Sequence, residues 1–251
     1  RDRSPSRGLG DVYKRQVVEM NYKAIDAGVD AVHKVEVPAS WSNPEADPAP
    51  KKLTGRPETV KMVEDLMNPI ALMDGDSLPV SAFMGNPDGQ FEQGASAYEK
   101  RGTAVTVPTW DAAKCIQCNQ CAFVCSHATI RPFMLSEDEV KAAPANIKLA
   151  DTKPKASEYK YTMSVSPLDC MGCGECITVC PVGAIEMVPQ ESQAEEQPVF
   201  DYLVANVGKK PGMPADNTVK GSQFNQPLLE FSGSCAGCAE TSYARLITQL
   251  F

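Results

Sequence analysis

The chain has 251 residues, 43% of them hydrophobic and 22% charged, so it is long enough for one or two domains that each bury a core. Its 24 Lys and Arg residues against 32 Asp and Glu residues give a net charge of −8. This balance argues against a nucleic-acid partner, because such binding depends on neutralising phosphates. The longest apolar run is far shorter than the roughly 18 to 20 residues that span a bilayer, so no membrane partner is expected either.

The first part of the chain is predicted to hold a tail, a helix and a short strand. Residues 1–16 are basic, resemble translated adapter sequence and are expected to be a non-native tail. A helical face begins at Val17 and ends near Gly28. An alternating strand follows at Lys34–Val37, where His33 would be a half-buried structural residue.

The next part is predicted to be a connection, a second helix and a β-rich unit. Prolines and charges at Asn43–Gly55 indicate a surface connection. The second helix begins near Pro57 and is expected to stop at Asn68-Pro69. Ser77–Trp110 is rich in Gly and Pro with short alternating pieces, which predicts a small β-rich unit and, with the rest, an α+β fold class.

Ten cysteines occur without a secretory signal peptide, which favours metal or redox chemistry in a reducing, cytoplasmic compartment over a disulfide framework. They are clustered, whereas a disulfide framework would normally scatter them. The three groups are Cys115, Cys118, Cys121 and Cys125; Cys170, Cys173, Cys176 and Cys180; and Cys235 with Cys238.

The first two groups share the spacing C-x2-C-x2-C-x3-C, and the second is followed by Pro181, as in bacterial ferredoxins that hold two 4Fe–4S clusters. In such proteins the fourth cysteine of each run ligates the other cluster. The expected ligands are therefore Cys115, Cys118, Cys121 and Cys180 for cluster one, and Cys170, Cys173, Cys176 and Cys125 for cluster two.

The two runs belong to an internal repeat, in which Cys125–Ile130 matches Cys180–Ile185, so each copy should form a loop, a short helix and a strand. The longer connection between the copies predicts an insertion. Its lysines are expected to form a solvated face or, as the sharper alternative, a docking surface for an acidic electron carrier. These lysines are Lys141, Lys148, Lys153, Lys155 and Lys160.

Zinc is the main alternative for the cysteine runs, since four thiolates also build tetrahedral zinc sites. Zinc sites favour pairs of C-x2-C separated by a longer gap, so iron and sulfide fit this spacing better. His127 is expected to support a site rather than ligate it, because both clusters already have four thiolates. Glu99-Lys100-Arg101 is by default a solvated charge run.

Several motifs together resemble the pyruvate:ferredoxin (flavodoxin) oxidoreductase family, over Val17 to Phe251 and so as an internal fragment. The departures are Ser126, where the family usually has Pro, and Ala239, where it usually has Gly. Neither removes a ligand. The motifs are Leu78-Pro79-Val80-Ser81-Ala82-Phe83, Ser96-Ala97-Tyr98-Glu99-Lys100-Arg101-Gly102, Val107-Pro108-x-Trp110 with Cys115–Cys121, and Gly233–Thr241.

The resemblance implies a domain order. Residues 17–69 would end a coenzyme A-associated domain, and 70–110 would be the domain named after its Glu-Lys-Arg signature (EKR). Residues 111–199 would form the bacterial-ferredoxin-like domain with two 4Fe–4S clusters. Residues 200–251 would be a linker and the truncated start of a thiamine diphosphate domain, so that partial α/β segments flank the central part. Near the end of this stretch, the apolar spacing of Tyr243, Leu246, Ile247 and Leu250 predicts an amphipathic helix.

The resemblance also implies a reaction: oxidative decarboxylation of pyruvate with coenzyme A to acetyl-CoA and carbon dioxide, with electrons relayed to ferredoxin or flavodoxin. Cys235 and Cys238 would supply half of a third 4Fe–4S cluster, and Glu240 would lie against thiamine diphosphate and its Mg. These two cofactors belong to the full-length protein, which is expected to be a homodimer. The fragment holds no catalytic residue and alone should not turn over pyruvate.

Two other readings stay open at this stage. One is a ferredoxin-like electron-transfer subunit of another 2-oxoacid oxidoreductase or of a hydrogenase-type complex, which the EKR signature and the C-terminal C-x2-C-x-Glu disfavour. The other is a structural zinc or disulfide protein, which would lack the visible absorption of iron–sulfur proteins. For Cys235 and Cys238 alone, the spacing would equally suit a zinc half-site or a redox pair.

Overall fold

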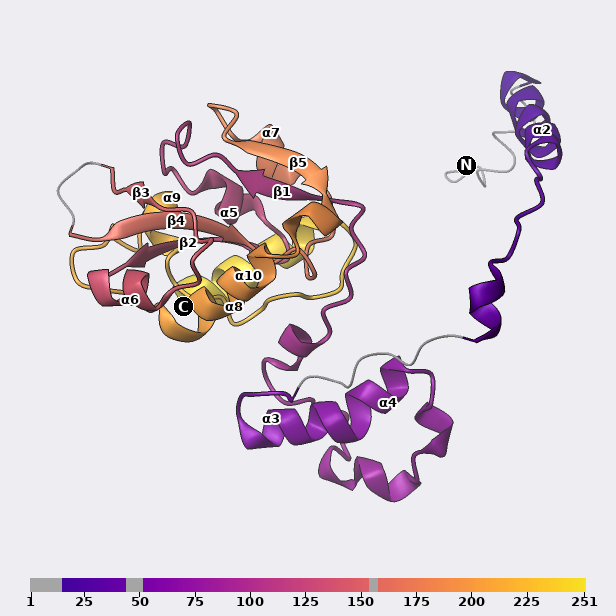
Figure 1. The fold of residues 1–251 in the computed structure, drawn as a ribbon, viewed down its shortest axis with the longest axis horizontal. Helices are drawn as coiled ribbons and strands as arrows, with labels where there is room; N and C mark the ends of the chain where they lie inside the picture. Colours follow the sequence, from indigo (N-terminus) through magenta and orange to yellow (C-terminus); the bar gives the residue numbers. More distant parts are fainter. Residues whose placement is uncertain (1–14, 44–51, 154–157) are drawn as a thin grey trace, which may run out of the picture. The chain divides into compact units, whose positions relative to one another are not determined.

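The computed structural model describes residues 15–43, 52–153 and 158–251. The chain divides into two compact units, residues 1–52 and 53–251, and each is described by itself (Figure 1). Most of the expected tail and of the Asn43–Gly55 connection, and also Lys155, lies outside the described residues.

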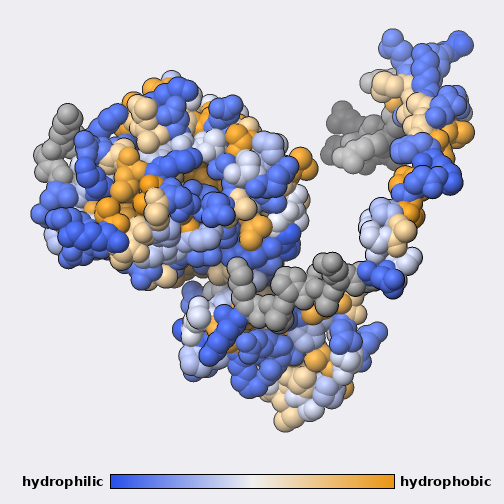
Figure 2. Space-filling view, in the orientation of Figure 1, coloured by the Kyte–Doolittle hydropathy of each residue, from blue (hydrophilic) through white to orange (hydrophobic). Residues whose placement is uncertain are grey.

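In its described residues, the first unit holds the helix α2 (Arg15–Asp30), as predicted from the apolar spacing that begins at Val17, followed by a 3₁₀ turn at Ala39–Ser42. The strand predicted at Lys34–Val37 is wrong: these residues pair with no strand in the described part of this unit. Without a partner strand the alternating pattern cannot form a sheet. His33 is consequently exposed, with Nδ1 3.2 Å from the Ala31 carbonyl oxygen. Most of the large apolar side chains of α2 are exposed as well, and none is buried (Figure 2).

The second unit begins with α3 (Pro57–Met62), which has its proline in the first turn as predicted. The helix does not stop at Asn68-Pro69, because a π-helical turn at Val63–Met67 leads directly into α4 (Asn68–Ala71). The Asn68 N–H donates to the Val63 carbonyl five residues earlier. Pro69 thereby falls in the first turn of α4, where the missing N–H breaks no helical hydrogen bond.

The β-rich unit predicted over Ser77–Trp110 is wrong for most of that stretch. Short 3₁₀ helices occupy Gly75–Ser77, Val80–Gly85 and Ala95–Tyr98, because frequent Gly and Pro interrupt any longer alternation. The alternation near Val107 does form a strand, β1 (Thr106–Trp110), but this strand pairs inside the cysteine-rich part.

The cysteine-rich part contains two small antiparallel sheets, with strand orders β1–β5 and β2–β4–β3. As predicted, each repeat copy forms a loop, a short helix and a strand. The first copy has α5 (Gln120–Val124) and β2 (Ile130–Leu135), and the second has α7 (Glu175–Thr178) and β5 (Ile185–Pro189).

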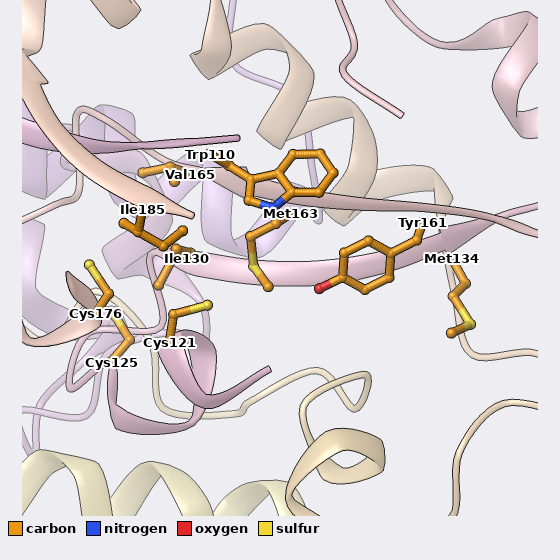
Figure 3. Packing of buried hydrophobic residues seen from close by; sticks show 10 residues of the cluster. All are labelled: Trp110, Cys121, Cys125, Ile130, Met134, Tyr161, Met163, Val165, Cys176 and Ile185. Atoms are coloured by element: carbon orange, nitrogen blue, oxygen red, sulfur yellow. The ribbon is translucent and has the colours of Figure 1, made fainter. Parts of the chain in front are cut away.

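The strand pairing exchanges the two copies. β1 lies before the first cysteine run and pairs with β5, which follows the second run, in the register Trp110 to Ile185. β4 (Lys160–Val165) lies before the second run and pairs with β2, which follows the first. The beginning of each run is therefore tied to the end of the other. Figure 3 shows how Cys121, Cys125 and Cys176 pack beneath these strands.

The longer connection between the copies adds α6 (Glu137–Ala142) and β3 (Ala150–Asp151) before β4. Ser136 and Glu139 form a capping box that starts α6. After β5 come a 3₁₀ turn at Gln190–Gln193, α8 (Glu196–Asn206) and α9 (Val219–Ser222). α8 packs through Leu203 on the sheet that contains β2.

The last helix, α10 (Ala239–Leu250), forms as predicted. The face that it buries is not the apolar face that the spacing indicated. Its buried residues are the polar Arg245 and Gln249. Tyr243 and Ile247, on the predicted apolar face, are 68% and 60% exposed. Overall, mixed helices and small sheets confirm the α+β class.

Candidate metal centres

Four cysteines from both runs line one cavity: Cys115, Cys118 and Cys121 from the first run, and Cys180 from the end of the second. The pairing of β1 with β5 places Cys180 there. The remaining lining is mostly apolar and includes Ile116, Met163, Val182 and Ile185. We call this group of four cysteines the first centre.

The other four cysteines form a second neighbourhood. Burial, together with the nearby Cys125 from the first run, raises the pKa of the Cys170 thiol to about 11 and that of Cys176 to about 12. The charge of Cys173 also contributes to the raised pKa of these two thiols, although the Cys173 side chain is itself exposed. We call Cys125, Cys170, Cys173 and Cys176 the second centre.

The two centres adjoin through Cys121 and Cys176. Burial raises the pKa of Cys121, and Cys176 is the largest neighbouring charge that raises it further. In the described residues, no three His, Cys, Asp or Glu side chains are close enough together to hold a single metal ion. The two centres instead offer sets of four thiols, each drawn from both runs.

Backbone N–H groups donate to cysteine sulfurs at matching places in the two repeat copies. In each copy the first cysteine accepts from the residue two positions later, and the fourth accepts from the residue four positions later. The four hydrogen bonds are Gln117 N to Cys115 Sγ at 3.3 Å, Gly172 N to Cys170 Sγ at 3.4 Å, Thr129 N to Cys125 Sγ at 3.4 Å, and Ala184 N to Cys180 Sγ at 3.1 Å.

This arrangement requires left-handed backbone at three places in each copy. In the second copy these are Gly172, Gly174 and Gly183, with φ of 68°, 78° and 60°. The corresponding residues of the first copy adopt the same conformation without being glycine. They are Gln117, Asn119 and Ala128, with φ of 61°, 61° and 55°.

Gln117 and Asn119 are supporting residues that our reading of the sequence missed. Both side chains are almost fully buried, at 1% exposure. Gln117 donates to the Asp151 carbonyl and accepts from the Lys153 N–H, each at 2.7 Å. Asn119 donates to the Lys220 carbonyl at 2.8 Å and accepts from the Tyr161 hydroxyl at 2.7 Å. These bonds hold a costly backbone conformation in place. Aligning the repeat copies on their glycines could have revealed both positions.

The third cysteine pair lies beside the second centre. A Cβ atom added to Gly237, between Cys235 and Cys238, would be 3.5 Å from Cβ of Cys173. Both ring nitrogens of His127 contact the same segment: Nε2 is 3.2 Å from the Cys235 carbonyl oxygen, and Nδ1 is 3.2 Å from Ser232 Oγ.

The remaining residues singled out by sequence have different settings. Ser126, the departure from the family pattern, has its hydroxyl 3.1 Å from that of Ser242 in α10. Glu240 is exposed in the first turn of α10. The Glu-Lys-Arg triad is not simply solvated, because Lys100 lies 2.6 Å from Asp169, whose side chain is 3% exposed.

Comparison with known proteins agrees with this geometry. Residues 114–184 match the family model described as a 4Fe-4S dicluster domain, so this part of the chain is similar to iron–sulfur dicluster domains. Residues 45–104 match EKR, described as a domain of unknown function. In the described residues, no helix has the length and apolar character needed to cross a membrane.

Whole-chain relatives give the more particular identification. The chain is 48% identical over 237 residues to the pyruvate-flavodoxin oxidoreductase of Klebsiella pneumoniae and 45% identical over 241 residues to the pyruvate:ferredoxin oxidoreductase of Moorella thermoacetica. It is 40% identical to the mitochondrial pyruvate dehydrogenase (NADP+) of Euglena gracilis. Each match covers 94% of this chain, but only 20%, 20% and 13% of the relative. The chain thus corresponds to a segment of pyruvate:ferredoxin and pyruvate-flavodoxin oxidoreductases, which confirms the resemblance.

The repeat symmetry predicts that Ala128→Gly stabilises the protein. Glycine adopts left-handed backbone freely, so the free energy of unfolding should rise by about 0.5 to 1 kcal/mol. The measurement is urea unfolding of the variant against wild type. Ala122→Gly, a buried position inside α5, is the matched control and should lower stability by about 1 kcal/mol. Equal destabilisation by both changes would contradict the assigned backbone conformation.

Proposed function

We propose that this segment relays electrons through two 4Fe–4S clusters within a larger enzyme that oxidatively decarboxylates pyruvate. The observation that carries the proposal is the shared cavity of Cys115, Cys118, Cys121 and Cys180. The neighbourhood of Cys125 with Cys170 and Cys176 supports the matching assignment for the second cluster. When bound, such clusters accept and release single electrons.

The residues present fit this cofactor. Thiolates are the ligands of iron–sulfur clusters, and the raised pKa values of Cys170 and Cys176 mean that iron must displace protons from these thiols as it binds. The four N–H groups that point at cysteine sulfurs would stabilise negative charge on a bound cluster. The apolar lining of the first centre would limit access of water.

The position of the third cysteine pair supports a direction for the relay. Cys235 and Cys238 lie beside Cys173, so electrons would enter the second centre from that side. The lysine-bearing insertion lies at the other end, where Lys153 Nζ donates to the Cys115 carbonyl at 2.8 Å. An acidic ferredoxin or flavodoxin would dock there and accept electrons from the first centre.

The remaining chemistry belongs to the full-length enzyme. The names of the relatives mention pyruvate, ferredoxin and flavodoxin. We propose that the full-length form of this protein likewise acts on pyruvate and passes electrons to ferredoxin or flavodoxin. It would also use coenzyme A, thiamine diphosphate with Mg and a third 4Fe–4S cluster on Cys235 and Cys238, and it would form a homodimer. Glu240 would contact the thiamine cofactor. All ten cysteines are free thiols, which suits a reducing, cytoplasmic compartment.

Anaerobic reconstitution of the chain should yield about eight iron atoms per molecule, because two sets of four thiolates are complete. The measurement is iron and zinc content together with visible absorption. Removing the iron with a chelator should also lower the thermal midpoint, because metal binding contributes to folding. Little iron with stoichiometric zinc would sink the assignment.

Crossed ligation predicts that Cys180→Ala damages the cluster bound by Cys115, Cys118 and Cys121. Cys125→Ala should instead damage the one bound by Cys170, Cys173 and Cys176. Paramagnetic resonance of the reduced protein, with iron content, distinguishes the two clusters. The two variants are controls for each other. A disturbance confined to the cluster of the mutated run would show that the ligation is not crossed.

In the full-length protein, Cys235→Ser should leave the two complete clusters intact, because neither uses this thiol. Reduction of ferredoxin by pyruvate should fall by on the order of a hundredfold or more, because the entry point of the relay is lost. Iron content and the pyruvate-dependent rate are the measurements. A wild-type rate would remove the third pair from the relay and leave the two-cluster assignment unaffected.

A further inference from the structure

Two cations lie over the ring of Phe231. Its side chain is buried, and the Lys100 ammonium and the Arg131 guanidinium are 5.0 and 5.3 Å from its ring centroid. Both distances are within the range at which a cation is attracted to an aromatic ring. Phe231 also has a φ of 49°, a rare conformation for a bulky residue, so the surroundings must hold it there.

The two cations come from different parts of the chain, and each has its own carboxylate. Lys100 belongs to the Glu-Lys-Arg triad and pairs with Asp169, the residue before Cys170 of the second centre. Arg131 is on β2 and pairs with Glu230, the residue before Phe231. These cation–π contacts and ion pairs therefore join the triad, the loop of the second centre and β2 to the segment that carries Phe231.

We call residues 230–238 the strap, because this segment leads from Phe231 to the third cysteine pair. The Phe231 N–H donates to the His127 carbonyl at 3.0 Å, and the His127 ring contacts Ser232 and Cys235. A Cβ atom at Gly233 would be 2.2 Å from Nη2 of Arg101, so this triad residue lies directly against the strap. The strap is thus contacted by Lys100 and Arg101 of the triad and by His127.

We propose that the Glu-Lys-Arg triad positions the third cysteine pair against the second centre, and that this sets the rate of electron transfer between them. The triad would act through the cation–π contact of Lys100 with Phe231, which also contacts Arg131. Phe231 is four residues from Cys235, so fixing its ring would fix the position of the cysteine pair. The inference rests on the proposed third cluster and gives the EKR domain a role: a clamp for the strap. Because electron tunnelling weakens steeply with distance, a small displacement of the strap would slow the relay.

The test uses the full-length protein, purified anaerobically with its clusters, and the variant Phe231→Leu. Leucine keeps the site apolar but removes the attraction for both cations. We expect wild-type iron content, a weaker magnetic interaction between the reduced third and second clusters, and electron transfer slower by on the order of tenfold to a hundredfold. Lys100→Arg should stay close to wild type, because it keeps the charge over the ring.

Lys61→Met is the matched control, since Lys61 forms an exposed ion pair with Asp65 in the same EKR match. It should change none of the three measurements. A wild-type magnetic interaction and rate in Phe231→Leu would overturn the proposal. Loss of iron from all centres would also overturn it, because the cation–π contacts of Phe231 would then support the whole fold rather than position the strap.

Iron at Cys235 and Cys238 is measured first in the wild-type protein. Its absence there would overturn the proposed third cluster. Hydrogen exchange of the strap amides then decides the positioning role, because it needs no iron at this pair. Faster exchange confined to residues 230–238 in Phe231→Leu is expected, and unchanged protection would overturn the clamp.

Discussion

The exchanged pairing of strands is the constraint on which the cysteine chemistry depends. β1 and β5 join the start of the first run to the end of the second, and β4 and β2 do the converse. Cys180 therefore reaches the cavity of the first run, and Cys125 reaches the thiols of the second. Each set of four thiols therefore draws one cysteine from the other run, so neither run supplies a complete set by itself.

The repeat also explains where the chain accepts unfavourable backbone. Tight cysteine loops need left-handed residues so that N–H groups can point at sulfur, and the second copy uses glycine for this. The first copy uses Gln117 and Asn119, whose buried side chains bind the insertion and the Lys220 region. The first loop thereby gains anchors for later segments of the chain that glycine would not provide.

The sequence allowed the cysteine-rich part to be predicted well, because its signals are local and repeated. Each run contains a loop and a short helix and is followed by a strand, as expected, and the family resemblance holds across 94% of the chain. Predictions failed where the outcome depended on partners. Lys34–Val37 alternates but pairs with no strand in the part of the chain that the structure describes, and the alternation near Val107 belongs to the cysteine-rich part rather than to the EKR region.

The prediction for the helix near the third cysteine pair failed for a related reason. Apolar spacing predicted that α10 would bury Tyr243 and Ile247, whereas Arg245 is the side chain that is buried, at 1% exposure. Its partners in the described residues are neutral oxygens, including the Phe123 carbonyl and Gln249 Oε1, and its Nε atom has none. Burial lowers the pKa of Arg245, and the nearby Cys125 opposes this shift.

A buried cation is costly unless negative charge lies close by. Cys125 supplies such charge only as a thiolate, which is the form that ligates iron. The polar inner face of α10 is therefore best matched to the iron-loaded state of the second centre. In that state Arg245 would help to join the helix of the third cysteine pair to the domain that would receive electrons from this pair in the proposed relay.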